Sequence, residues 1–425
     1  MNRIILIGNG FDLAHGMPTS YGSFIDDYWR SKKKEIFTHY QGKEFEDDCI
    51  LIKRVPNIEY SLPESDYESI QRSLRYADDE IIFKNDFFAV LNKHKSFLNW
   101  VDIENDYYFL LKNCYKKPSI YTIAQLNKEF SIIESLLEKY LTKVEKEFSK
   151  GFPNNDEEIS FKRSIYEVIY SDFNLRDFSE TSINHLTEIE FQRVYTEIKS
   201  IEEGRFSLYD FELSERDLRL YQILINNNNI KQKLKDLLTS ETANNYFRHR
   251  PKEVLFVNFN YTSTEVYYDN PPIDHEFGQD ISTNVIHIHG ILNNKTDNKI
   301  IFGFGDEIDK DYLEIENLND NEYLQNIKSM KYLESDSYKK LLEFINSNNY
   351  QVFIFGHSCG ISDRTLLNTL FEHKNCSSVK PYYRQKNDGT DNYSEMIRNI
   401  SRNFTDKASM RDKVVNKKFT EALFR

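Results

Sequence analysis

RIILIGNGFDLAHGMPTS, residues 3–20, is an apolar run followed by a turn that contains two glycines, Gly8 and Gly10. The run over residues 4–7 is continuous rather than alternating, which is typical of a strand covered on both faces, as in a parallel sheet. A strand that runs into a glycine turn also begins many nucleotide-binding sheets. This stretch therefore predicts the first strand of an α/β sheet.

Further apolar, β-branched runs crowd into the last two-fifths of the chain. They are EVLFVNF from Glu253, NVIHIHG from Asn284, KIIFGFG from Lys299, YQVFIFG from Tyr350 and VKPYYR from Val379. Most of these runs end in small or polar residues. Because ligands of open parallel sheets bind beyond the carboxyl ends of the strands, we expect the functional site there.

The middle of the chain has a helical pattern. AQLNKEFSIIESLLEKYLTKVEKEF, which starts at Ala124, has apolar residues at helical spacing, and RDLRLYQILINN and SEMIRNISRNF repeat that spacing. We therefore predict an α/β, Rossmann-like fold with a mostly parallel sheet. Residues 1–30 and 251–425 would form its nucleotide-binding core, and residues 31–250 a mostly helical insertion or cap.

Composition narrows the class of protein. The chain has 425 residues and a formal net charge of -13, which opposes nonspecific binding to nucleic acid. No segment approaches the ~20 apolar residues of a membrane span, and the start lacks the pattern of a signal peptide. The cysteines lack metal-finger spacing; they are Cys49, Cys114, Cys359 and Cys376. We expect a cytoplasmic protein with reduced thiols and no membrane partner.

The opening turn does not complete a dehydrogenase fingerprint. That fingerprint needs G-x-G-x-x-G and an acidic residue at the end of a second strand. Gly8 and Gly10 fit, but Leu13 stands in place of the third glycine, and Asp26 and Asp27 lie in a helical pattern. A hydride-transfer cofactor is therefore not predicted.

The same turn could still hold an anion, because small residues let backbone N–H groups approach a phosphate. The alternative is that the glycines around Asn9 serve only the geometry of the turn. Asp12 and His15 follow within a few residues. Either could face a ligand, and Asp12 could instead cap a helix.

Two later strand ends carry paired polar residues. Asn258 and Asn260 are two residues apart, so we expect both amides on one side of the strand. They could bind a sugar hydroxyl or a water, or cap a turn.

His287 and His289 alternate along a strand in the same way. They could form a metal site with His357 or an aspartate, or His289 could be a general base above a packed His287. We favour the base, because no carboxylate lies nearby at a ligand-like spacing.

The segment around Gly356, His357 and Ser358 matches the G-x-S-x-G pattern of a hydrolase nucleophile. The expected order of serine, acid and histidine is not met, because Asp363 would lie on the helix of the nucleophile and His373 one helix away. The segment better fits a strand, a glycine turn and a helix that hold a second anion or a ribose, with Ser358 and Asp363 as contacts or caps.

One carboxylate lies in an apolar helical pattern. In FLNWVDIENDYYFLL, Glu104 is four residues after Trp100 and three before Tyr107, on or beside the apolar face. A carboxylate there needs a partner or has a raised pKa. It could pair with an arginine in a core, or be lent to the active site by the insertion.

Taken in order, these motifs resemble the AbiH-type bacterial abortive-infection proteins. The motifs are IGNGFDLAHGMPTSY, WVDIE, VNFNYT, HIHG and FGHSCGISD, and the resemblance spans essentially the whole chain. The later motifs resemble, more distantly, sirtuin-like NAD-consuming domains: Asn260-Tyr261 matches their asparagine, His289-Gly290 their catalytic histidine segment and residues 356–358 their late turn. Thr262 stands where those domains have Asp, the first turn is Gly-Asn-Gly-Phe-Asp, and zinc-binding cysteine pairs are missing.

The resemblance implies an effector that depletes NAD, as a substrate, in an infected cell by releasing nicotinamide. The catalytic residues would then be Asn260, His289, Asp12 and Glu104, and no metal would be needed. The binding residues would be Gly8, Asn9, Gly10, His15, Asn258, Gly356, His357, Ser358 and Asp363. A phage-derived trigger or partner protein and a homo-oligomer are compatible with that role.

Two other functions remain open from the sequence. One is a nucleotide or phage-signal sensor without turnover on the same fold. The other is a metal-dependent nuclease or phosphohydrolase that uses His287, His289, His357 and Asp363, although the acidic charge and the missing carboxylate cluster count against it.

Overall fold

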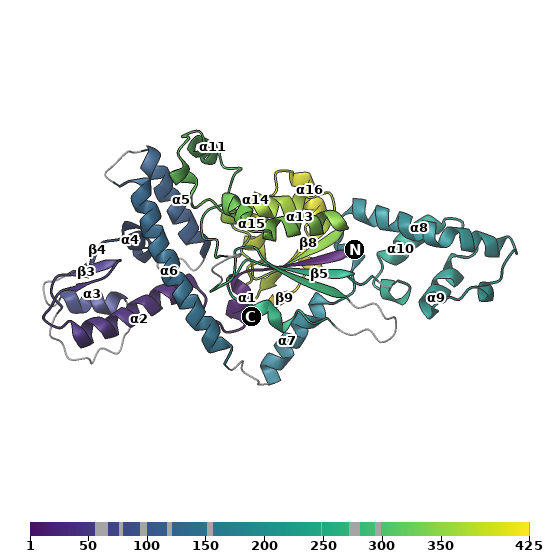
Figure 1. The fold of residues 1–425 in the computed structure, drawn as a ribbon. Helices are drawn as coiled ribbons and strands as arrows, with labels where there is room; N and C mark the ends of the chain where they lie inside the picture. Colours follow the sequence, from purple (N-terminus) through teal and green to yellow (C-terminus); the bar gives the residue numbers. More distant parts are fainter. Residues whose placement is uncertain are drawn as a thin grey trace.

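The computed structural model describes residues 1–55, 67–75, 80–93, 100–116, 121–150, 156–247, 249–271, 281–293 and 299–424. At its centre is a six-stranded parallel sheet in the order β6-β5-β1-β7-β8-β9 (Figure 1). The strands are β1 (Asn2–Ile7), β5 (Glu253–Asn258), β6 (Ser282–His287), β7 (Tyr350–Phe355), β8 (Cys376–Arg384) and β9 (Ala422–Phe424). The predicted α/β class with a parallel sheet is confirmed.

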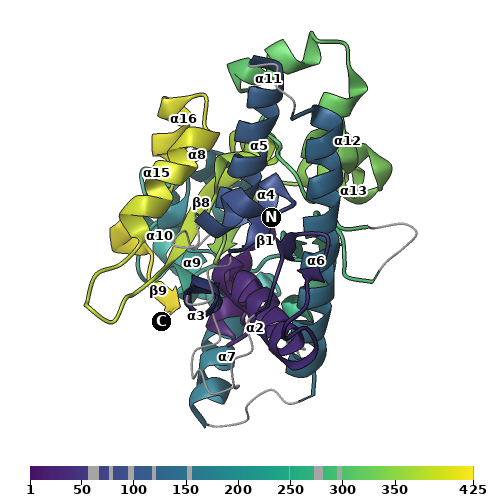
Figure 2. The same ribbon diagram turned by 90° about the vertical axis from the view of Figure 1, so that its left-hand side faces the viewer.

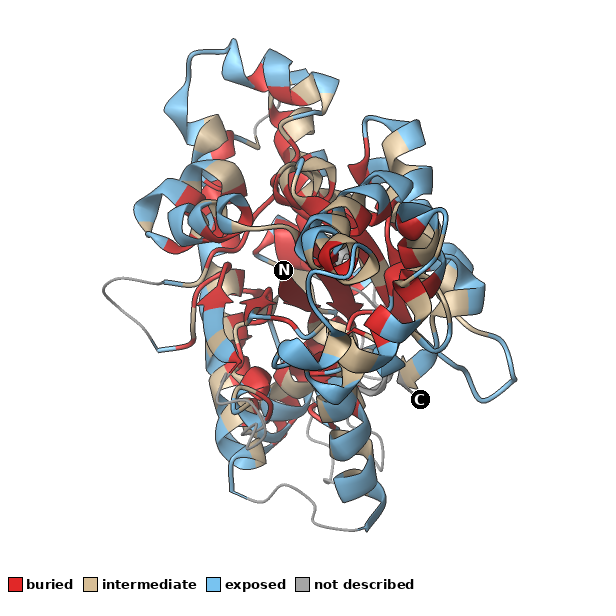
Figure 3. Cartoon of the chain, turned by 90° about the vertical axis from the view of Figure 1, so that its right-hand side faces the viewer, coloured by how far each residue is buried: buried red, intermediate tan, exposed pale blue. Residues whose placement is uncertain are grey.

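The first strand is covered on both faces, as its continuous apolar run predicts. Ile4 and Leu6 pack on one face, and Ile5 and Ile7 pack on the other. The first face is covered by α13 (Ser337–Ser347), α14 (Arg364–Glu372) and α15 (Tyr393–Asn403). The second is covered by α1 (Asn9–Ala14) and α7 (Asp156–Ile169). Figure 3 shows the buried strands inside a shell of partly exposed helices.

The strand predicted from Lys299 is wrong. Residues 299–305 form no regular strand, and Phe304 makes only an isolated bridge with Ile327. The backbone bonds of this segment go to different neighbours: Ile301 N donates to His289 O and Phe304 N donates to Asn326 O. No single neighbouring strand is therefore available to build a ladder.

Apart from α7, which packs on the sheet, the helices of the inserted residues form two bodies on opposite sides of the sheet (Figure 1). The first is a lobe of α2 (Tyr21–His39), α3 (Tyr67–Arg75), α4 (Asp86–Lys93), α5 (Trp100–Lys116), α6 (Ile123–Phe148) and a small antiparallel sheet of β2 (Phe45–Glu46), β3 (Ile50–Ile52) and β4 (Ile82–Phe83). The second is an arm of α8 (Glu180–Glu202), α9 (Glu215–Leu224) and α10 (Ile230–Leu238). The expected boundary at residue 30 falls inside α2.

The lobe lies at the end of the sheet toward which β1 runs. In Figure 1 this end carries α1, and in Figure 2 helices α5 and α6 stand side by side in front of the strands. The lobe can therefore contribute side chains to the carboxyl edge of the sheet.

The remaining α-helices are short: α11 (Lys310–Glu316), α12 (Lys328–Lys331) and α16 (Lys407–Lys413).

All four cysteines are buried and free of disulfides. Among the helices that the structure describes, none combines the length and the apolar character needed to cross a membrane.

Candidate active site

A cavity of about 520 Å³ lies at the carboxyl edge of the sheet. Gly8 follows β1, Asn260 follows β5, His289 follows β6 and Ser358 follows β7, and all four line this cavity. Glu104 reaches the same cavity from α5 of the lobe. The strand ends thus bring together residues that are hundreds of positions apart in the sequence, as expected for a parallel sheet.

The two glycine turns pack directly on each other. Gly8 N donates to Phe355 O at 3.0 Å, and Gly10 N donates to Gly356 O at 2.9 Å. Gly356 has a φ of +66°, and a Cβ there would lie 2.1 Å from Phe11 N. These glycines therefore serve close backbone packing, and the amide hydrogens of Gly8 and Gly10 are already used. A phosphate cradle made from those two amides does not form.

A buried network of charges forms the floor of the cavity. Lys328 Nζ lies 2.7 Å from Glu104 Oε1 and 2.8 Å from Asp363 Oδ1. Asp363 Oδ1 also lies 3.2 Å from His289 Nε2. Lys328 is on α12, Asp363 is in the turn after β7, and Glu104 is on α5. The network therefore joins the lobe to the sheet core, and the partner of Glu104 is a lysine rather than an arginine.

The network sets the protonation of its carboxyl groups. Burial raises the pKa of Glu104 to about 7, against the charge of Lys328. Burial alone would also raise the pKa of Asp363, but Lys328 and His289 bring it well below its usual value. Burial lowers the pKa of Lys328, and the two carboxylates more than offset this, so that its pKa is raised. Lys328 and Asp363 are therefore an ion pair, and Glu104 titrates near neutral pH.

His289 is held as a neutral ring. Burial lowers its pKa to about 4, and the charge of Lys328 adds to this while Asp363 opposes it. His289 Nδ1 lies 3.1 Å from the carbonyl oxygen of Phe259. Nε2 lies 3.2 Å from Asp363 Oδ1 and 3.2 Å from the hydroxyl of Tyr332. Such a ring can accept a proton at neutral pH.

A second polar group surrounds Asp12, which also lines the cavity. Its carboxylate accepts hydrogen bonds from Thr262 Oγ1 at 2.5 Å and from Thr264 Oγ1 at 2.6 Å. Burial raises the pKa of Asp12 to about 6, against these bonds. The sequence departs from the sirtuin-like pattern at the first turn and at Thr262. These two places are in contact, because Asp12 follows the first turn and accepts the bond from Thr262.

Asn260 lies beside Asp12 in this part of the cavity. Its side-chain amide interacts with the Asp12 carboxyl and lowers the pKa of that group. The Nδ2 atom is buried and makes no hydrogen bond of regular geometry among the residues that the structure describes. Asn260 and Asp12 therefore form one polar pair at the wall of the cavity.

Three other predicted site residues have structural partners. Asn258 is buried behind the cavity, where Nδ2 donates to Thr262 O and to Glu265 Oε2 and fixes the loop after β5. His15 is bonded to Phe11 O and to the Tyr268 hydroxyl and does not line the cavity. Asn9 lines the cavity, and its Oδ1 accepts from Thr19 Oγ1 at 2.6 Å.

His357 also lines the cavity and faces the charge network. Cys359 N donates to His357 Nδ1 at 3.0 Å, so the proton of the neutral ring lies on Nε2, 3.6 Å from Asp363 Oδ2. The ring also packs against Phe259, with centroids 4.1 Å apart. His357 therefore helps to position Asp363.

The two alternative catalytic groupings do not assemble. His287 lies 2.9 Å from Glu265 rather than with the residues of the charge network, and no group of three or more His, Cys, Asp or Glu within the described ranges is placed to hold a metal ion. For a serine hydrolase, Ser358 would need a histidine partner. His373 instead ends α14, where its Nδ1 accepts from Asn375 N, and Asp363 is paired with Lys328.

Several residues at the cavity were not predicted from the sequence. Lys328 lines the cavity, and Tyr332 lies behind His289. Both are in a segment without any motif, and a buried lysine leaves no signal in such a segment. Arg384 ends β8, Lys386 follows it, and both line the same cavity. The sequence did contain a signal for them, because they lie at the end of the apolar run that starts at Val379.

The fold and the cavity define an α/β protein with an ionisable site at the carboxyl edge of a parallel sheet. The chain belongs to a family described as bacteriophage abortive infection AbiH, whose model matches residues 4–384. This membership supports an anti-phage, abortive-infection role. No curated protein and no solved structure matches the chain.

Proposed function

We propose that the protein is an NAD glycohydrolase, which cleaves the bond between nicotinamide and ribose in the cavity at the sheet edge. The observation that carries this proposal is the joint placement of the Asn260–Asp12 pair and a neutral His289 ring on one cavity. About 520 Å³ is within the usual range for small-molecule sites. Depletion of NAD would halt phage replication at the expense of the host.

The chemistry assigns a role to each group. The C1′–N bond breaks, its electron pair neutralises the nicotinamide ring, and a water oxygen attacks C1′ to give ADP-ribose. The transition state resembles an oxocarbenium ion, by analogy with glycoside hydrolysis. Asn260 would orient the water or a ribose hydroxyl, and the neutral ring of His289 would accept the released proton. The carboxylate of Asp12 or Glu104 would stabilise the positive charge on the sugar.

The pyrophosphate of NAD needs donors other than the amides of Gly8 and Gly10, which are already bonded. Arg384 and Lys386 line the same cavity and carry positive charge. We expect them to hold the phosphates, since arginine binds phosphate oxygens in a bidentate manner. Gly356 and Ser358 would then lie near the adenosine ribose.

The direct test is nicotinamide release from NAD by the purified chain, together with cellular NAD during phage challenge. Wild type should deplete NAD in infected cells, and Asn260→Ala should reduce the depletion at least tenfold, because the orienting donor is lost. The matched control is Asn346→Ala on the exposed side of α13. Binding of NAD without any release, in infected and uninfected extracts alike, would contradict hydrolysis and assign the cavity to nucleotide sensing.

The raised pKa of Glu104 predicts a pH profile. Glu104 titrates at about 7, and only its ionised form stabilises a positive charge, so turnover should increase as the pH rises through that value. We expect kcat to increase about tenfold from about pH 6 to about pH 8 in wild type. Glu104→Gln should lose this increase and keep the lower rate throughout. Glu147→Gln, at an exposed position of α6, is the control and should retain the wild-type profile.

A further inference from the structure

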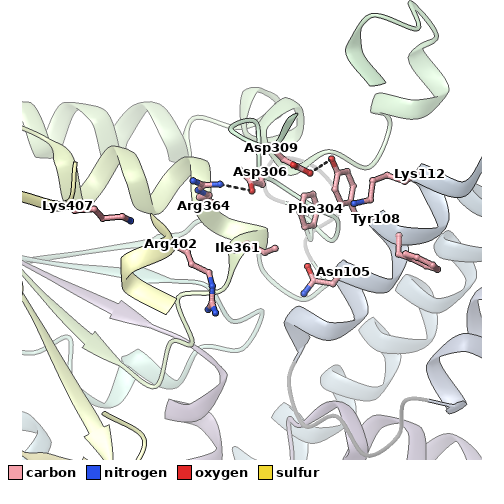
Figure 4. A pocket seen from close by; sticks show the side chains of 11 residues that line it. Asn105, Tyr108, Lys112, Phe304, Asp306, Asp309, Ile361, Arg364, Arg402 and Lys407 are labelled. Atoms are coloured by element: carbon pink, nitrogen blue, oxygen red, sulfur yellow. Dashed lines mark hydrogen bonds and ion pairs between the residues drawn. The ribbon is translucent and has the colours of Figure 1, made fainter. Parts of the chain in front are cut away.

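A second hollow of about 510 Å³ lies between the lobe and the helices of the sheet core. Figure 4 shows α5 on one side of it, with Asn105, Tyr108 and Lys112, and the core helices on the other, with Arg364 and Arg402. None of the residues that line this hollow lines the cavity at the sheet edge. It is therefore a separate site.

The core side of the hollow is basic. Arg364 begins α14, Arg402 lies on α15, and Lys407 begins α16 (Figure 4). Arg402 and Lys407 are exposed side chains on a chain whose net charge is -13. A concentration of cations on an acidic protein attracts anions.

The arginines have unused donors. Arg364 Nη1 lies 3.3 Å from Asp306 Oδ2, while its Nε is buried and has no partner in the described part of the chain. Arg402 Nη1 donates to Asn399 Oδ1 at 2.6 Å, which uses one of the five N–H groups of a guanidinium. Arg402 is exposed, so its remaining N–H groups can reach an anion in the hollow.

The acidic residues at the hollow are already engaged. Asp309 Oδ2 accepts from the Tyr108 hydroxyl at 2.8 Å, and Asp306 Oδ1 accepts from Ile308 N at 3.0 Å. Tyr108 stacks on Phe304, with centroids 3.9 Å apart and an angle of 6° between the rings, so this wall has an aromatic surface beside Lys112. A basic wall opposite an aromatic wall fits a phosphate-bearing anion.

We infer that this hollow is a second ligand site, which binds a phosphate-bearing anion on Arg364 and Arg402 and thereby acts on the site at the sheet edge. Each wall of the hollow contains a residue that is adjacent in the sequence to a carboxylate of the charge network. Asn105 follows Glu104 on α5, and Arg364 follows Asp363. A ligand that draws the two walls together would therefore shift the two carboxylates that Lys328 bridges.

The test is calorimetric titration of the full chain with inorganic pyrophosphate and, separately, with ADP. Arg402→Gln and Arg364→Gln should each raise the Kd for pyrophosphate at least tenfold, while Arg398→Gln, an exposed position on the same α15, should not. Tighter binding of ADP than of pyrophosphate would identify the ligand as a nucleotide, and equal binding would identify the phosphate group alone. An unchanged Kd in Arg402→Gln and Arg364→Gln, or no binding of either probe to wild type, would overturn the inference.

The coupling has its own readout, which does not depend on NAD hydrolysis. Pyrophosphate should slow amide hydrogen exchange in α5 and in residues 361–372 of wild type, and should not do so in Arg402→Gln. The Asn260→Ala variant should bind pyrophosphate at this site as wild type does, so failure of the hydrolase proposal would leave this inference standing. Slowed exchange confined to the sheet-edge cavity would place the ligand there and contradict the second site.

Discussion

Replacement of His289 by alanine should lower nicotinamide release by roughly 10²- to 10⁴-fold, the usual contribution of a general base. The ring is neutral because burial lowers its pKa to about 4, so it can accept a proton across the physiological range. This base should therefore add no pH dependence above about pH 5, and the rise in kcat near pH 7 should come from Glu104 alone. Steady-state release of nicotinamide from NAD measures the loss.

A matched control separates catalysis from stability. His185→Ala, at an exposed position of α8, should release nicotinamide at the wild-type rate. His289→Gln keeps a polar side chain opposite Phe259 and Tyr332, and we expect it to keep the thermal midpoint within a few degrees and still lose the rate. Full activity of a folded His289→Ala variant would exclude His289 as the base.

Replacement of Lys328 by methionine should destabilise the fold by about 3–5 kcal/mol, the usual cost of breaking a buried ion pair. The ammonium group lies within 2.8 Å of both Glu104 and Asp363, and all three side chains are nearly inaccessible to solvent. Without Lys328 the pKa of both carboxyls would rise, and each would have to take up a proton or remain buried as an unpaired charge. Urea unfolding, followed by circular dichroism, measures the change.

The double variant Lys328→Met, Glu104→Gln tests the cause. Removing one of the two carboxylates should recover part of the stability, and a double-mutant cycle gives the coupling between the two side chains. Lys339→Met, at an exposed position of α13, should change the free energy of unfolding by no more than about 0.5 kcal/mol. A Lys328→Met variant as stable as Lys339→Met would show that the network contributes nothing to the fold.

Most of the sheet could be predicted from the sequence, because strands covered on both faces leave continuous apolar runs. Such a run overlaps each of the strands β1, β5, β6, β7 and β8. The run from Lys299 has the same composition and forms no strand, since its backbone bonds are shared between Asn326 and His289. A local sequence pattern does not show which distant segments will form hydrogen bonds with a strand. The division of the insertion into two bodies also depends on such distant contacts, and it was not predicted.

The residues of the cavity could be predicted in part. Asn260, His289 and Ser358 each follow an apolar strand, so the rule for parallel sheets places them at one edge. Asn258 and His15 have the same kind of signal, yet their side chains bond to Glu265 and Tyr268 instead of lining the cavity. The direction in which a side chain turns after a strand depends on tertiary partners. No sequence pattern marks Lys328, because its role depends on contacts with two carboxylates, Glu104 and Asp363, that are distant in the sequence.

The bridge from Glu104 through Lys328 to Asp363 also has a consequence for synthesis of the chain. Translation delivers the lobe first, while β7 and Asp363 are made more than two hundred residues later, and β1 cannot pair with β7 until then. The catalytic arrangement that we propose is therefore absent from a nascent chain until Asp363 has been made. A cell that makes this protein would not be exposed to the proposed activity before that point of synthesis.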